Sequence, residues 1–164
     1  MTTVQIATDH VDIVSAKDFE TTVEHLAAAL GKASTGELME RLANSQSWED
    51  YAEQCASLAG SSGLIEVGHL NWGEVLSLSG VAMKARCFIV GNPLTAQKLL
   101  SAGGAKVGLY LPAKILVFEA NDGKAHVAYD TFGSLMKPFG LDALDRVASA
   151  IDAVLERLAF AAAN

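Results

Sequence analysis

Cysteine is scarce in this chain, which has only Cys55 and Cys87 among 164 residues. One falls in a predicted helix and the other in a predicted strand, and isolated cysteines of this kind are usually buried thiols. The four histidines are scattered, and no His, Cys, Asp or Glu residues have the spacing of metal ligands. The sequence therefore predicts no disulfide, no metal site and no cofactor.

Clusters of positive charge are also missing, because 12 Lys and Arg residues stand against 19 Asp and Glu residues, for a net charge of −7. A nucleic-acid-binding protein needs a basic patch for the phosphate backbone. No apolar run approaches the roughly 20 residues of a membrane-spanning helix. The first residues lack the basic-then-apolar pattern of a signal peptide. We therefore expect a cytoplasmic protein that binds neither nucleic acid nor membranes.

Apolar residues, by contrast, are abundant, at 51% of the chain with a mean hydropathy of +0.27. Much of the excess is alanine in runs that favour helices, including 26–30 and 161–163. We interpret this as close helix packing, with a buried homodimer contact. The length fits a single domain over residues 1–164.

The spacing of apolar residues predicts alternating strands and helices. Residues 4–15 are expected to be extended, with the better strand at 10–15, and Ser15 and Asp18 have the spacing of a capping box before a helix. The remaining expectations are helices near 19–30, 35–43, 47–59, 94–101 and 141–162, and strands near 64–70, 84–91, 114–119 and 124–130. Residues 71–80 fit either a short helix or a loop, and 131–138 resemble a loop. This order predicts an α+β fold, an antiparallel sheet covered mainly on one side by long helices, with a helical segment at about 35–60.

Asn92 follows an apolar strand and precedes a proline, so it is placed to cap the next helix. The amides at such a helix start can also bind an anion. Since the glycine-rich loop of a phosphate site is absent, we favour the capping role over the anion site.

Tyr110, Tyr129 and Asp130 are placed to line one end of the sheet. A phenol and a carboxylate can serve as proton donor and acceptor, which would suit an enzyme. The alternative, which we favour, is a tyrosine packed on the sheet and an aspartate that turns the chain into a loop.

The connection 131–140 is unusually apolar for a loop, since it carries Phe132 and Met136. Such a segment is expected to form a lid, the rim of a pocket or a subunit contact.

Several short motifs together resemble the domain of unknown function 302 family. They are Val90-Gly91-Asn92-Pro93-Leu94, Tyr110-Leu111-Pro112, Asp122-Gly123 and Tyr129-Asp130. The resemblance implies a TATA-binding-protein-like or helix-grip-like α+β fold, with a curved antiparallel sheet packed against long helices and often a dimer. It implies no established activity, cofactor or catalytic residue.

The sequence favours a non-enzymatic module that binds a small apolar or anionic ligand, or a partner, in an apolar cavity between the sheet and the helices. One alternative is an enzyme that uses Tyr129 and Asp130. The other is a structural homodimer joined through the alanine-rich face of 141–162. The residues expected to contact a ligand are Asn92, Tyr110, Tyr129, Asp130, Phe132 and Met136.

Overall fold

The computed structural model describes residues 3 and 5–164, so Val4, where the extended segment was expected to begin, lies outside them. Its strands are β1 (His10–Val14), β2 (Gly31–Lys32), β3 (Ile65–Asn71), β4 (Ala85–Gly91), β5 (Ala113–Glu119) and β6 (Ala125–Asp130). Its α-helices are α1 (Phe19–Ala28), α2 (Thr35–Asn44), α3 (Trp48–Leu58), α4 (Trp72–Ser77), α5 (Pro93–Gly103), α6 (Phe132–Met136) and α7 (Asp142–Ala163). Two short 3-10 helices, η1 (Ala105–Tyr110) and η2 (Lys137–Phe139), complete the order.

The strands form one six-stranded sheet in the order β1-β6-β5-β4-β3-β2. All neighbouring pairs are antiparallel except β2 and β3, which are parallel. The expected α+β class is therefore confirmed, with one additional edge strand. Gly31, directly after the helix expected near 19–30, opens β2, where a Cβ atom would overlap the Leu58 carbonyl oxygen. Only glycine permits this close approach of two backbone segments.

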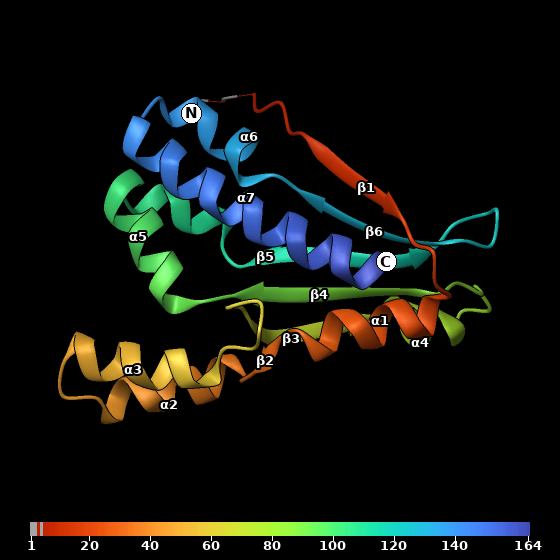
Figure 1. The fold of residues 1–164 in the computed structure, drawn as a ribbon, viewed down its shortest axis with the longest axis horizontal. Helices are drawn as coiled ribbons and strands as arrows, with labels where there is room; N and C mark the ends of the chain where they lie inside the picture. Colours follow the sequence, from red (N-terminus) through yellow and green to blue (C-terminus); the bar gives the residue numbers. More distant parts are fainter. Residues whose placement is uncertain (1–2, 4) are drawn as a thin grey trace.

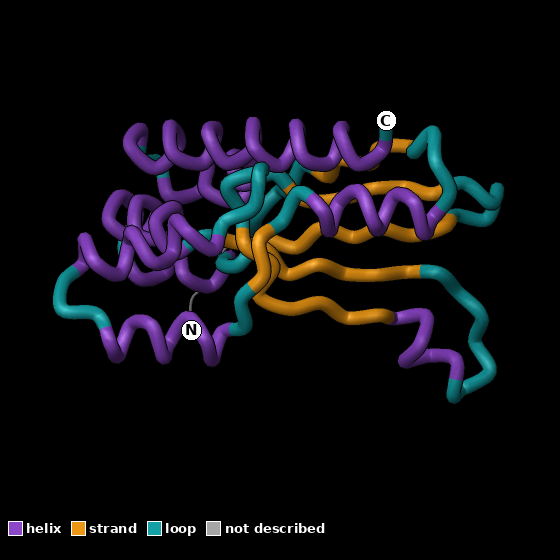
Figure 2. Tube along the Cα trace, turned by 60° about the horizontal axis from the view of Figure 1, so that its bottom comes forward, coloured by secondary structure: helices purple, strands orange, loops and turns teal. Residues whose placement is uncertain are grey.

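Helices α1 and α7 lie side by side on one face of the sheet (Figures 1 and 2). Their apolar stripes, such as Phe19, Val23 and Leu26 on α1, bury against Val117 and Val127 of the sheet. A helix with one apolar face gains most of its stability from such burial.

Four of the eight alanines of α7 are buried in the main core: Ala148, Ala159, Ala162 and Ala163. Ala143, Ala150 and Ala161 are exposed. Small side chains let α7 approach α1 and the sheet closely. The buried alanines are thus used within one chain, and self-association through the exposed side of α7 stays a prediction.

The start of α1 also differs from expectation. Asp18 itself is the N-cap, since its carboxylate accepts a hydrogen bond from the Thr21 amide at 2.9 Å. Ser15 is buried, and its hydroxyl donates to the carbonyl oxygen of Ala163 at 3.0 Å. The predicted capping box between Ser15 and Asp18 is therefore wrong, and Ser15 ties the chain before α1 to the end of α7.

Helices α2 and α3 pack together beyond one end of the sheet (Figure 1). They have a small core of their own, built from Leu38, Tyr51 and Cys55 with Ile65 of β3 and Ala33. The chain therefore contains a large core under α1 and α7 and a second, smaller core under α2 and α3.

The two uncertain segments both contain short helices. Asn71 caps α4, with its side-chain oxygen 3.3 Å from the Glu74 amide. Segment 131–138, expected to resemble a loop, contains α6 because Thr131 caps it locally and Asp152 of α7 accepts from its first amides.

The opposite face of the sheet carries no helix among the described residues (Figure 2). Ile89, Leu116 and Phe118 stand on it, and each is only half-buried. No helix in the described part of the chain is both long and apolar enough to cross a membrane.

Candidate ligand cavity

A cavity of about 200 Å³ lies where the two cores meet. Leu38 and Val67 line it from the side of the small core, and Val90, Leu99 and Ile151 from the side of the large core. The α2–α3 pair packs against the end of the sheet and α5 without filling the space beneath α7. The cavity is therefore a gap between two separately packed units.

The lining of this cavity is almost entirely apolar. Thr35, Asn92 and Thr95 are its polar side chains, and none of its lining residues carries a titratable side chain. Such a lining suits an apolar group, because a charged group without a partner would lose its hydration there. It offers no residue able to act as acid, base or strong nucleophile near neutral pH.

Asn92 lines the cavity but its side chain is committed to structure. Its oxygen accepts from the Leu94 amide at 2.9 Å and its nitrogen donates to the Gly63 carbonyl at 2.9 Å. The predicted capping role is confirmed.

The start of α5 has no amide available for an anion. Pro93 has no N–H, the Leu94 amide is used by the cap, and the amides of Thr95 and Ala96 donate to the Asn92 carbonyl. The alternative anion site at this helix start therefore lacks donors.

Phe132 and Met136 occupy different surroundings although both belong to α6. Phe132 lines the cavity, whereas Met136 is fully buried in the main core and does not reach it. Asp152 holds α6 in place, since its two carboxylate oxygens accept from the Phe132 amide at 2.6 Å and the Gly133 amide at 2.8 Å. The sequence pattern gave no signal for Asp152, because its partners lie about 20 residues away on another helix.

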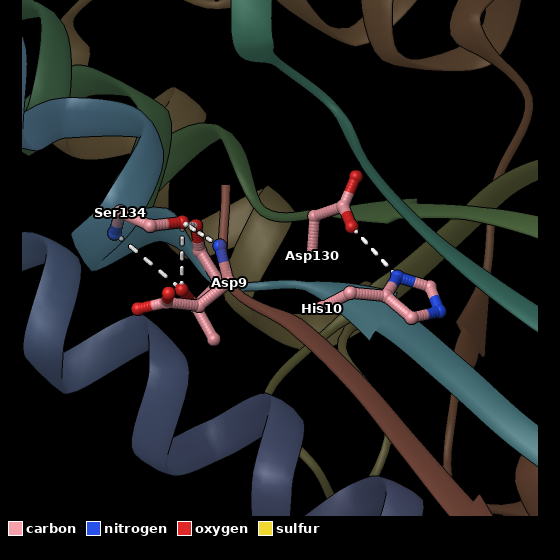
Figure 3. A network of polar contacts seen from close by, with 5 residues as sticks. Asp9, His10, Asp130 and Ser134 are labelled. Atoms are coloured by element: carbon pink, nitrogen blue, oxygen red, sulfur yellow. Dashed lines mark hydrogen bonds and ion pairs between the residues drawn. The ribbon is translucent and has the colours of Figure 1, made fainter. Parts of the chain in front are cut away.

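Tyr129 and Asp130 do not converge. Tyr129 is buried on the helix-covered face of β6, and burial, with Glu156 and then Asp152 adding to it, raises the pKa of its phenol. Asp130 points to the open face, because successive strand residues alternate sides, and there it pairs with His10 at 2.9 Å (Figure 3). The favoured interpretation, a tyrosine packed on the sheet and an aspartate at the end of the strand, is therefore confirmed, and the alternative proton donor and acceptor pair is not formed.

Tyr110 also lies outside the cavity. Its ring packs edge-on against Phe139, with ring centroids 6.2 Å apart. Of the six residues expected to contact a ligand, the structure brings together Asn92 and Phe132 at the cavity and distributes the other four elsewhere.

The polar network of Figure 3 joins the start of β1 to α6. The Ser134 hydroxyl accepts from the Asp9 amide at 3.0 Å and donates to the Thr131 carbonyl at 2.9 Å. These bonds satisfy local backbone groups, so this network has a structural role. No group of three or more potential metal ligands gathers anywhere in the described residues.

Comparison with known proteins gives a family and a fold. The family model described as "Domain of unknown function DUF302" matches residues 39–162. The crystal structure of an uncharacterized conserved DUF302 protein from Bacillus stearothermophilus is similar, with a TM-score of 0.65 and 19% sequence identity. That match covers 93% of this chain and 97% of the other. No curated protein matches the chain.

Proposed function

This chain belongs to the DUF302 family, whose description states no activity. From the geometry of the cavity, we propose that the protein binds a small, mainly apolar molecule between the sheet, α5 and α7. The observation that carries this proposal is an apolar cavity of about 200 Å³ at the junction of two cores. Side chains from seven helices and strands line it, and nearly all of them are apolar.

The volume sets the size of the ligand. Sites for drug-sized molecules measure about 300–1,000 Å³, so a cavity of about 200 Å³ suits a smaller molecule or one section of a longer molecule. The lining favours binding over catalysis, since the polar side chains present are an amide and two hydroxyls.

The first experiment is native mass spectrometry of the purified protein, compared with its denatured mass. A non-covalent adduct would support the proposal and give the ligand's mass. The second is a titration with 1-octanol followed by two-dimensional NMR. Shifts clustered around Leu38, Leu99 and Phe132 are expected, whereas shifts spread over the surface would contradict the proposal.

A matched pair of variants tests the location. Ala96 lines the cavity, so Ala96→Leu should occupy part of it and weaken 1-octanol binding at least tenfold. Gln97, the next residue, is exposed and does not line the cavity, so Gln97→Leu should bind as the wild type does. Equal affinities in both variants would place the octanol elsewhere.

A second candidate function is self-association through the open face of the sheet, which we define by Ile89, Leu116 and Phe118 with the exposed Leu70 beside them. Strands about 4.8 Å apart with about 3.3 Å per residue make a six-stranded sheet roughly 24 Å by 20 Å across. That area, of order 500 Å², approaches the roughly 800 Å² that each partner buries in a standard interface. Further exposed apolar side chains lie in α4 and in the connection from α4 to β4, namely Trp72, Val75, Leu78, Val81 and Met83.

A second copy of this chain is the partner this face fits, because a two-fold dimer uses the same patch on both subunits. The charged residues on the same face already pair within one chain, as His10 does with Asp130 and His126 with Asp12. Light scattering with size-exclusion chromatography should give a dimer at micromolar concentration. The substitution Leu116→Lys, at the centre of the face, should convert the dimer to a monomer. Phe160→Lys, on the exposed side of α7, should remain dimeric. A monomeric wild type would eliminate this candidate.

A further inference from the structure

Two further clefts adjoin the cavity in a row beside α7. The cavity shares Leu64, Thr95 and Ile151 with a cleft between α5 and α7, and that cleft shares Ser62 and Val154 with a third near the end of α1. We call this row the α7 groove. On α7 the second and third clefts run from Val147 to Ala161, which at 1.5 Å per residue is about 21 Å. The cavity meets α7 in the middle of this stretch, at Ile151 and Leu155.

Polarity changes along the α7 groove. The cavity has no charged lining, whereas the second cleft is lined by Lys98 and the third by Arg157. These two cations are the charged side chains of the whole lining, in a protein with a net charge of −7. Positive charge in the clefts beside an apolar cavity is therefore a local reversal of the overall charge.

Neither Lys98 nor Arg157 belongs to an ion pair within residues 3 and 5–164. Glu156 precedes Arg157, but adjacent residues of a helix do not face each other, and Glu156 does not line the groove. Thr95 lines both the cavity and the second cleft and lies one turn before Lys98 on α5. Its hydroxyl and the Lys98 ammonium thus stand on neighbouring positions of one helix face, at the point where the apolar lining ends.

We propose that the α7 groove binds a single-chain amphiphile of the alkyl carboxylate class, with the tail in the cavity and the carboxylate at Lys98 and Thr95. This inference rests on the proposed function, since it assigns the chemical class of the molecule held by the cavity. The tail gains from leaving water, and the head keeps its charge because it stays at the exposed Lys98. A cationic head would be repelled by Lys98 and Arg157.

The experiment compares three probes that share an eight-carbon tail: octanoate, 1-octanol and octyltrimethylammonium. Each is titrated below its micelle concentration by isothermal calorimetry at low salt. Octanoate should bind most tightly and octyltrimethylammonium least. Each added methylene in the alkanoate series should tighten binding about fourfold until the cavity is full.

Lys98→Gln should weaken octanoate binding about threefold to tenfold and leave 1-octanol unchanged. Lys124→Gln, at the hairpin between β5 and β6, removes the same charge away from the groove and should change neither. Because Lys98 is exposed, both variants are expected to fold, which thermal unfolding checks.

The outcomes separate the two proposals. If 1-octanol and octanoate bind equally and Lys98→Gln has no effect, the carboxylate assignment is overturned while the cavity proposal stands. If octyltrimethylammonium binds best, the assignment is also overturned. If none of the probes binds, the cavity proposal fails and the assignment fails with it.

Discussion

Asp152 shows how one side chain can set the shape of the cavity. Its carboxylate accepts from the Phe132 and Gly133 amides, so it holds the first turn of α6, whose Phe132 forms a cavity wall. Asp152→Ala should lower the free energy of unfolding by about 1–3 kcal/mol, because two amides lose a charged acceptor. Urea unfolding measures this, with Glu156→Ala, an exposed position one turn further along α7, as the control. Equal losses in the two variants would contradict the role assigned to Asp152.

Cys87 provides a second prediction. Burial raises the pKa of its thiol above the ordinary value of 9.0, and the nearby Lys114 opposes this only partly. Since the thiolate is the reactive form, a raised pKa means less thiolate at any given pH. Alkylation of Cys87 by iodoacetamide should therefore be slow at pH 7.5 and still rising above pH 9, when followed by mass spectrometry of the peptide. A rate that levels off by pH 8 would contradict this, and the urea-unfolded protein supplies the reference rate.

Residue roles were predictable from the sequence only where the chemistry is local. Asn92 was identified as a cap because a cap bonds to the amide two residues on. Tyr129 was correctly expected to pack on the sheet, and strand alternation alone places its neighbour Asp130 on the opposite face. Asp152 was missed because its partners belong to another helix.

At the scale of the helices, two glycines should respond oppositely to the same change. Gly36 lies in α2, where a Cβ atom would meet only the Ser34 hydroxyl at 3.7 Å, so Gly36→Ala should raise the free energy of unfolding by about 0.5–1 kcal/mol. Gly103 ends α5, where a Cβ atom would lie 2.5 Å from Val107 Cγ2 and 2.8 Å from Leu144 Cδ2. Gly103→Ala should therefore lower the free energy of unfolding by about 1–3 kcal/mol. Urea unfolding of both variants checks this, and stabilisation by Gly103→Ala would show that the helix end relaxes.

Elements were predictable where apolar periodicity and caps agree, as in α2, α3, α5 and α7. Two elements depend on distant partners instead. Strand β2 is only Gly31–Lys32 and exists because it pairs with β3, and α6 is capped in part by Asp152. A two-residue strand and a five-residue helix carry too little periodicity to be recognised alone.

At the scale of the whole molecule, the position of the cavity follows from having two cores of unequal size. The sequence indicated an apolar cavity beside the sheet and the helices. It could not indicate the junction with α2 and α3, because that depends on how the two cores meet. The same division has a consequence for dynamics, since a unit with few buried side chains opens more easily than one with many.

Native-state hydrogen exchange should therefore resolve two levels of stability. Helices α2 and α3 pack on the small core, whereas β4, β5 and β6 belong to the large core. The amide hydrogens of α2 and α3 should therefore exchange through an opening that costs less free energy than the opening that exposes the amides of the sheet. The cavity is lined from both cores, so a bound ligand couples them and should raise protection in α2 and α3 more than in the sheet. Exchange followed by mass spectrometry, with and without saturating 1-octanol, measures both effects, and α4, which does not line the cavity, is the internal control. A single opening free energy throughout the chain would mean that the two cores unfold as one. Protection gained only in α1, which does not line the cavity, would place the ligand away from the junction.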